Sequence, residues 1–362
     1  MHLTRPKAFL IVACATAAGI FSGRQLGWLA GLAAALLVLH SHALAWNLQR
    51  PPGITGVSFD VQLTSFAHGI APDYTSALAE IMAPQCVAPA AAGQYVQFDD
   101  DEAFRYLDTR RALGGKGARI QISSTSPTFN CDPHSIEIPT DVFEYDKVGS
   151  AGIQMLREAK VRTLVSRNAL SREKRVFDAY ADGTTAENGL GSYTDDDKDP
   201  IAEIDSIIAS LATSTGQRNI DLVIGLGAFQ QIRNHPKVLA RMPGADLATL
   251  SPERLRALLI LPVQIHIAML PIATEKVGKA ASKTVIANDK IYALITQKNP
   301  SPFDPSAAKT FTTNLGQVQG VGMYEERPFA EINFMAWSED IKLTGASCVK
   351  RIDVTLGEVV ID

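Results

Sequence analysis

The chain has 362 residues, of which 46% are apolar and 20% charged, and its formal net charge is -4. A chain of this length has room for more than one compact lobe, and its charge balance gives no sign of a nucleic-acid-binding protein. The cysteines, Cys14, Cys86, Cys131 and Cys348, are widely spaced, which favours a reducing compartment and excludes both a disulfide scaffold and a zinc site made of close cysteine pairs.

The first 50 residues form a hydrophobic N-terminal extension that differs from the rest of the chain. It holds two apolar runs, and the second, residues 26–46, is long enough to span a bilayer. A basic start and the small-residue ending at residues 43–45 also resemble an export signal. The extension is therefore a membrane segment, an export signal or the product of a start codon placed too far upstream.

Residues 51–90 are predicted to form an N-terminal arm. The pair Pro51-Pro52 is typical of a linker, and the amphipathic stretch from Tyr74 to Met82 predicts a helix. We therefore expect an extended arm with a single helical segment.

Residues 91–145 are predicted to form an extended hairpin loop. Apolar and polar residues alternate at Tyr95–Phe98, Ala118–Ser123 and Ser135–Ile138, with turns rich in glycine and proline between them. Because an isolated hairpin is only marginally stable in water, we expect this one to lean on another copy of the protein.

Residues 146–198 are predicted to hold the longest helix and a connecting loop. Apolar side chains recur at helical spacing from Ser150 to Tyr180, and Ser171 is predicted to cap a second part of the helix. Seven Lys or Arg against three Asp or Glu make this helix basic. Its basic side chains are interpreted as a solvated face, with a contact to nucleic acid or to an acidic neighbouring subunit as alternatives.

The loop at residues 182–200 is rich in Gly, Thr and Asp, and its length predicts a boundary between two lobes. Its three consecutive aspartates, Asp195, Asp196 and Asp197, lack the alternate spacing of a calcium-binding loop. We interpret them as solvated charges.

Residues 199–272 are predicted to form a compact α/β lobe. Asp199-Pro200 begins an apolar helix that Gly216 ends. The elements that follow are a buried strand at Leu222–Ile224, a helix from Phe229 that stops before Pro236, a helix at Pro252–Leu259 capped by Ser251, and a strand at Val263–Met269.

Residues 273–362 are predicted to be rich in β-structure and to return the chain to the lobe of the long helix. The expected strands are Thr284–Ala287, Ile291–Thr296, Ala330–Trp337 and Ser347–Leu356.

The sequence predicts no enzyme, and no catalytic, cofactor-binding or metal-binding residue is assigned. Gly225-Leu226-Gly227 follows a strand as a dinucleotide loop does, but Gln230 stands where the third glycine is required. His235, before a proline, is interpreted as a helix terminator, and His266 as a satisfied core or interface histidine. His68 and His134 are isolated from other ligands in the sequence.

The order of these elements resembles the major capsid proteins of tailed bacteriophages, of the kind grouped with the lambda capsid protein E. The resemblance is strongest over Asp199–Met269, with its Asp-Pro-Ile start, its strand ending in Val-Ile-Gly and its Asn-His-Pro-Lys break. It continues more weakly over Phe59–Asp182 and Lys309–Asp353. The hydrophobic N-terminus departs from the family, whose members typically begin with a soluble arm or a polar scaffolding segment.

The resemblance implies an α+β fold of the Hong Kong 97-like kind, with an extended β-hairpin loop, a long spine helix, a peripheral β-rich lobe and an α/β axial lobe. It implies a structural protein that assembles with itself, through hexamers and pentamers, into an icosahedral phage or prophage head around double-stranded DNA. The implied partners are scaffold, portal and decoration proteins and packaged DNA held by non-specific contacts. The implied location is the virion, assembled in the host cytoplasm, with membrane association only through residues 26–46.

Three alternatives stay open. An encapsulin-like nanocompartment shell has the same fold with cargo enzymes inside. A membrane-anchored protein with a soluble α/β domain would insert its N-terminal extension, and a small-molecule enzyme would have a deep pocket near Gly225.

Overall fold

The computed structural model describes residues 58–59, 62–67, 78–98, 109–111, 113, 124–242, 250–273, 282–313, 321–327 and 330–357. Its internal contacts divide the chain into two units, Met1–Phe59 and Asp60–Asp362. In the first unit the described residues form strand β1 (Ser58–Phe59). The predicted hydrophobic extension, residues 1–50, lies outside the described residues.

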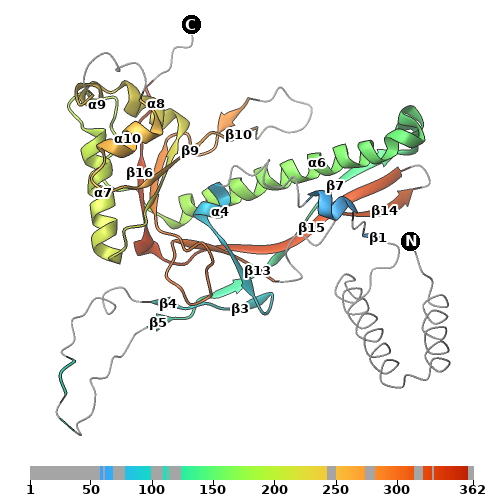
Figure 1. The fold of residues 1–362 in the computed structure, drawn as a ribbon, viewed down its shortest axis with the longest axis horizontal. Helices are drawn as coiled ribbons and strands as arrows, with labels where there is room; N and C mark the ends of the chain where they lie inside the picture. The colour runs from blue at the N-terminus through green and yellow to red at the C-terminus, as the bar shows by residue number, and fades with distance from the viewer. Residues whose placement is uncertain are drawn as a thin grey trace, which may run out of the picture. The chain divides into compact units, whose positions relative to one another are not determined.

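The second unit mixes helices and strands (Figure 1). Its helices include α4 (Leu78–Met82), α6 (Val142–Gly183), α7 (Pro200–Thr215), α8 (Leu226–Asn234), α9 (Pro236–Ala240) and α10 (Pro252–Leu258), with a 3₁₀ turn, η2, at Ala346–Cys348. Residues 62–67 are helical as well, so the predicted arm has more than the single helical segment expected. Its strands are β2 (Gln85–Ala88), β3 (Ala92–Gln94), β4 (Gln97–Phe98), β5 (Ser124–Thr125), β6 (Thr128–Asn130), β7 (Asp132–Asp141), β8 (Asp221–Gly225), β9 (Gln264–Ala268), β10 (Pro271–Ile272), β11 (Thr284–Val285), β12 (Lys290–Leu294), β13 (Ala308–Thr313), β14 (Val321–Arg327), β15 (Ala330–Leu343) and β16 (Val349–Asp353).

Helix α7 begins and ends at the residues that the sequence predicts. The side chain of Asp199 accepts hydrogen bonds from the amides of Ile201 and Ala202 at 3.2 and 3.3 Å, and Pro200 occupies the first turn, where no amide is needed. Gly216 ends the helix in the left-handed conformation, with φ 64°. The apolar face of the helix is buried. The capping residues and the pattern of burial therefore both agree with the predicted helix.

One sheet has the strand order β16-β12-β8-β9, in which β8 and β9 are parallel and β12 is antiparallel to both of its neighbours. Two of its strands, β12 and β16, come from residues 273–362. The prediction that residues 273–362 return to the lobe of the long helix is therefore wrong for these two strands. Residues 291–294 of β12 are buried, as is usual for a strand covered on both faces, and such a strand belongs in the middle of a sheet.

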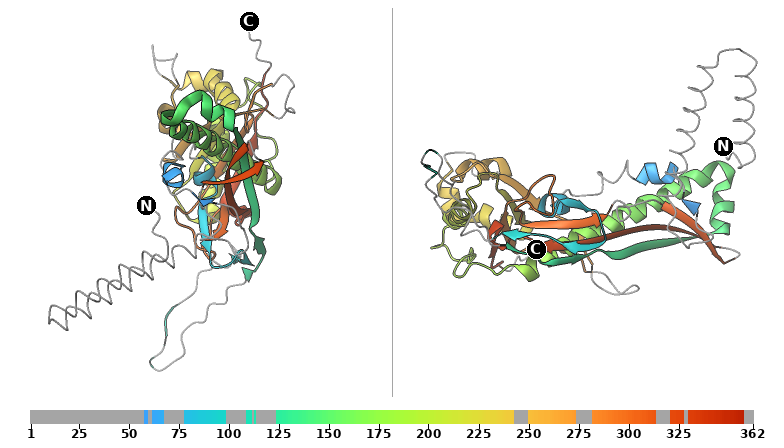
Figure 2. Two further views of the ribbon diagram at one scale, coloured as in Figure 1. Left: turned by 90° about the vertical axis from the view of Figure 1, so that its right-hand side faces the viewer. Right: turned by 90° about the horizontal axis from the view of Figure 1, so that it is seen from below.

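A second sheet is built around the long strand β15. One edge of β15 pairs with β14 and then with β13, and its other edge pairs with β7, all antiparallel. Strand β2 adds to β13 in parallel. Helix α6 runs along this sheet (Figure 2), and Val161, Leu164 and Val165 pack with Met335 and Trp337 in one apolar cluster. The strands β13 and β14 were not predicted.

Helix α6 is longer than the predicted Ser150–Tyr180. It begins with a capping box, in which Asp141 accepts from the amide of Phe143 and the Glu144 side chain accepts from the amide of Asp141. The backbone leaves helical geometry inside α6 only at Gly149. The prediction that Ser171 caps a second part is therefore wrong, because the helix passes through Ser171 without a break.

The predicted hairpin is partly described. Its two limbs pair antiparallel, β3 with β6 and β4 with β5, while the predicted strand Ala118–Ser123 lies outside the described residues. The predicted third strand, Ser135–Ile138, belongs to β7 and pairs with β15 instead. The limbs pack against their own chain, because Tyr95 and Phe129 stack on Phe311. The ring centroids of Tyr95 and Phe129 lie 5.4 and 4.3 Å from that of Phe311.

Candidate functional site

The glycine turn after β8 is closed by a turn from a distant part of the chain. A Cβ atom at Gly225 would lie 2.1 Å from the carbonyl oxygen of Ala287 and 2.5 Å from that of Asn288. The amide of Gly227 donates to Asn288 Oδ1 at 2.7 Å, and the amide of Ala228 donates to the Asn288 carbonyl at 2.9 Å. A dinucleotide phosphate would need these same amides at the start of α8. The interpretation of the glycines as structural is therefore supported.

His235 ends one helix and begins the next. It is 2% exposed, and it is both the C-cap of α8 and the N-cap of α9. Its Nδ1 accepts from the amide of Lys237 at 3.3 Å, and its Nε2 lies 3.2 Å from the carbonyl oxygen of Asp195. Both ring nitrogens are thus engaged, with the proton on Nε2. This geometry agrees with a helix terminator, and it anchors the loop after α6.

The loop after α6, predicted as a boundary, is held at several points. Asp195 Oδ1 accepts from the amide of Asp197 at 3.0 Å, and Lys237 donates to the carbonyl of Asp197. The side chain of Glu203 accepts from the amide of Gly191 at 2.8 Å. Within the described ranges, no three His, Cys, Asp or Glu side chains gather as they would around a metal ion.

The other predicted histidines have ordinary partners. His266, on β9, lies with Nε2 3.1 Å from Asp221 Oδ1, so it is satisfied but half-buried. His134, on β7, lies with Nε2 3.0 Å from an Arg175 nitrogen and stacks on Trp337. His68 lies outside the described residues.

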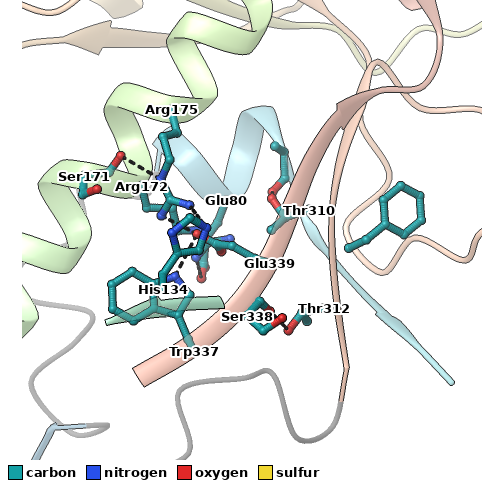
Figure 3. Close-up of polar contacts among 12 residues, drawn as sticks. Glu80, His134, Ser171, Arg172, Arg175, Thr310, Thr312, Trp337, Ser338 and Glu339 are labelled. Atoms are coloured by element: carbon teal, nitrogen blue, oxygen red, sulfur yellow. Dashed lines mark hydrogen bonds and ion pairs between the residues drawn. The ribbon is translucent and has the colours of Figure 1, made fainter. Parts of the chain in front are cut away.

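Helix α6 is joined to β15 by a group of polar side chains that we call the Glu339 clamp (Figure 3). Its members are Glu80, His134, Arg172, Arg175, Trp337 and Glu339. Arg175 reaches Glu339 Oε1 at 2.5 Å, and Arg172 lies 3.8 Å from Glu339 Oε2. The indole of Trp337 donates to Glu339 Oε1 at 3.1 Å. Glu339 is 6% exposed, so its charge depends on these partners rather than on water.

The clamp changes the interpretation of the basic helix. Arg157 pairs with Glu331 of β15 at 3.2 Å, and Lys160 pairs with Glu144 at 2.8 Å. Together with the two clamp arginines, most of the basic residues of α6 thus bind carboxylates of their own chain. The interpretation of these residues as a purely solvated face is therefore wrong. Arg162 and Arg167 do remain exposed.

Arg351 joins the end of α6 to the β8 sheet. Its Nη1 donates to the carbonyl oxygen of Ala181, in the last turn of α6, at 2.8 Å, and its Nε lies 3.0 Å from Asp353 Oδ1. A cation at this place also interacts favourably with the C-terminal end of the helix dipole. The helix is therefore fixed at its end as well as along its length.

Several large apolar side chains remain exposed on the second unit. Phe143 and Met155 on α6 are 66% and 72% exposed, and Ile260 and Met269 are 65% and 62% exposed. Ile260 also lines an open depression of about 390 Å³ beside α10. Such side chains are common singly on any protein, and in a protein that assembles they are natural contact points. None of the described helices is long and apolar enough to span a membrane.

Buried tyrosines predict a loss of stability at alkaline pH. Burial raises the pKa of Tyr180, Tyr193 and Tyr292 above the ordinary value of 10.0, because a phenolate is poorly solvated inside the protein. The unfolded chain therefore loses these protons first, so that the stability contributed by these tyrosines is complete below about pH 10 and falls as pH rises toward the folded-state pKa values. Burial lowers the pKa of Lys309, which opposes the trend. Burial also raises the pKa values of Cys86, Cys131, Tyr95 and Tyr145, which adds to it.

A pH titration checks this expectation. The chain has eight tyrosines, and we expect the part of the tyrosinate absorbance that comes from the buried ones to appear only together with the loss of circular dichroism, above pH 10. Tyrosines that all ionise near pH 10 while the dichroism stays native would contradict it.

Comparison with known proteins finds a similarity to phage proteins. No protein-family model matches it. A relative named "Major capsid protein", from Burkholderia phage BcepMu, is 27% identical over 193 residues, which cover 51% of this chain and 60% of the relative. The chain is thus matched over less than two thirds of that relative's length.

One solved structure shows the same fold, and a second aligns at a lower TM-score. A phage-related protein from Bordetella bronchiseptica aligns with a TM-score of 0.61 and 16% identity, over 82% of this chain and 97% of that chain. A virus-like particle protein from Pyrococcus furiosus aligns with a TM-score of 0.47 and 11% identity, over 81% of this chain and 98% of that chain. The resemblance to phage major capsid proteins and the predicted α+β, Hong Kong 97-like fold are confirmed.

Proposed function

We propose that this chain is a structural major capsid protein, which assembles through hexamers and pentamers into an icosahedral phage or prophage head around double-stranded DNA. The observation that carries the proposal is the match to the relative named a major capsid protein. The fold shared with a phage-related protein supports it. We assign no reaction to the chain.

In this proposal the two sheets have different tasks. The β8 sheet with α7 to α10 is the axial lobe, whose tips meet other copies around the symmetry axes, and the β15 sheet with α6 is the peripheral lobe. The paired limbs β3–β6 and β4–β5 are the base of a loop that lies over a neighbouring subunit. Rings of subunits need such heterologous contacts, in which one surface meets a different surface of the next copy.

The proposed partners follow from the same assignment. Other copies of the chain are the main partner, with scaffold, portal and decoration proteins acting during and after assembly. Packaged DNA is held by non-specific contacts, for which the exposed Arg162 and Arg167 are suitable. The proposed location is the virion, after assembly in the host cytoplasm.

Assembly of the purified protein tests the proposal. We expect both the full chain and residues 51–362 to form shells or ring-shaped capsomers, seen by electron microscopy and by light scattering. Shells that enclose a co-purified enzyme would instead favour the nanocompartment. A protein that stays monomeric over a wide range of concentration, salt and pH, with or without a scaffold protein, would overturn the proposal.

The hydrophobic extension needs its own test. If residues 26–46 form a membrane segment, the full chain floats with lipid vesicles in a density gradient and residues 51–362 do not. We expect neither to float, as for a head protein. Flotation of the full chain alone would favour the membrane-anchored alternative.

A further inference from the structure

Helix α6 and strand β15 are tied together at three levels along their length. At the first level, Arg157 Nη2 lies 3.2 Å from Glu331 Oε2. The second level is the Glu339 clamp, in which Arg175 reaches Glu339 at 2.5 Å. At the third level, a Cβ atom on Gly183 would lie 3.0 Å from Leu343 Cδ2. The order of these contacts shows that helix and strand run side by side in the same chain direction.

The spacings of the ties match although helix and strand rise at different rates. Arg157 and Arg175 are eighteen residues apart, which is about 27 Å along a helix at 1.5 Å per residue. Glu331 and Glu339 are eight residues apart, which is about 26 Å along a strand at 3.3 Å per residue. Both ion pairs therefore form together in one register, and a shift by one helical turn, about 5.4 Å, would break both.

Ion pairs fix this register in a way that the apolar contacts between the same elements do not. The cluster of Val161, Leu164 and Val165 against Met335 and Trp337 stabilises contact without strong direction, because the hydrophobic effect depends mainly on buried area. A guanidinium or a carboxylate that is left buried without its charged partner is costly, so a shift of the helix is penalised at each ion pair. The charges therefore decide where the helix stops along the strand.

We propose that Glu331 and Glu339 are positioning residues that lock the register of α6 on β15, so that helix and strand behave as one rigid beam in every subunit. The inference rests on the proposed function. If every subunit holds α6 at the same place on β15, neighbouring subunits meet at the same angle. All shells then have one size. Without the lock, subunits would differ in the placement of α6, and shells would vary in diameter or fail to close.

The test removes each negative charge while keeping the side-chain shape. The variants are Glu331→Gln, Glu339→Gln and both together, made in the full chain. The matched control is Lys174→Gln, because Lys174 pairs with Asp178 on the same helix at exposed positions, 43% and 55%, away from β15. We expect shells of the wild-type diameter to fall about tenfold in the double variant and to be unchanged in the control.

A charge exchange separates positioning from simple stabilisation. Arg157→Glu with Glu331→Arg restores an ion pair of reversed polarity at the less buried tie, where both side chains are only partly covered, at 28% and 20% exposure. We expect each single change to broaden the diameters and the exchange to narrow them again. If the double glutamine variant makes shells as uniform as the wild type, or if the variants lose thermal stability without any change in diameter, the inference is wrong.

Unassembled subunits provide a readout that does not depend on shells. The chain has three tryptophans, and only Trp337 lies in the clamp, so replacing Trp28 and Trp46 by phenylalanine leaves its fluorescence as the signal. We expect Glu339→Gln to shift the Trp337 emission, and the double variant to speed amide exchange along α6, while Lys174→Gln does neither. Unchanged exchange and emission would refute the lock, whereas a wild type without shells would refute the proposed function alone. If Glu339→Gln does not fold, Glu331→Gln carries the same test.

Discussion

Gly225→Ala is expected to lower the free energy of unfolding by about 3 kcal/mol. The added methyl group would lie 2.1 and 2.5 Å from two carbonyl oxygens, those of Ala287 and Asn288. These are backbone atoms, so no side-chain rotation relieves the overlap. The turn must move away, and its movement weakens the hydrogen bonds that the first amides of α8 donate to Asn288. Urea unfolding of the unassembled subunit, followed by circular dichroism, measures the loss.

Gly189→Ala is the matched control for this change. Gly189 has φ 78°, and no atom lies within 4 Å of the position of its missing Cβ. Its substitution therefore carries only the cost of a left-handed backbone, about 1–2 kcal/mol. Equal losses for the two variants would show that the turn at Ala287 yields easily, and the explanation of Gly225 by close packing would fail.

Glu339→Ala is expected to lower the free energy of unfolding by about 3–5 kcal/mol. The change leaves Arg175 without its carboxylate, and of the two carboxylates near Arg172 it leaves Glu80, at 3.4 Å. It also removes the acceptor of the Trp337 indole. Because Glu339 is 6% exposed, water cannot replace these contacts without opening the interface between α6 and β15. Thermal and urea unfolding of the subunit measure the effect.

Two comparisons test the reason for this loss. Lys174→Ala breaks an exposed pair on the same helix and is expected to cost about 0.5 kcal/mol or less. The combined variant Arg172→Met, Arg175→Met and Glu339→Leu is expected to lose less than Glu339→Ala alone, because it leaves no buried charge unpaired. A combined loss that equals the sum of three separate losses would argue against a coupled charge cluster.

The two substitutions, at Gly225 and at Glu339, affect different parts of the subunit. Gly225 closes the β8 sheet at the start of α8, and Glu339 holds the long helix on the β15 sheet. In a shell protein both act on the shape of the subunit and not on a reaction. Arg351 joins the two parts, since it contacts the last turn of α6 from β16.

Much of the β8 lobe could be predicted from the sequence, because its boundaries depend on neighbouring residues. Asp199 and Gly216 begin and end α7 through their own side chain and backbone, and His235 separates α8 from α9 in the same way. The buried strand β8 follows from a short apolar run. In each of these cases the interacting groups lie within a few residues of one another.

The remaining features depend on residues far apart in the sequence. The alternation of Ile291 and Val349 with their neighbours predicts strands but not the sheet they join, which is set by pairing with β8. The basic residues of α6 suggested a face open to solvent, because nothing near them in the sequence reveals the partner Glu339. By itself, the sequence determined where α7 begins and ends, where α8 ends and where α10 begins, and which phage proteins the chain resembles, whereas it missed the start of α8 and the whole of α9. Only the tertiary structure decided which strands share a sheet and which charges are buried, because pairing and burial depend on residues that meet only when the chain folds.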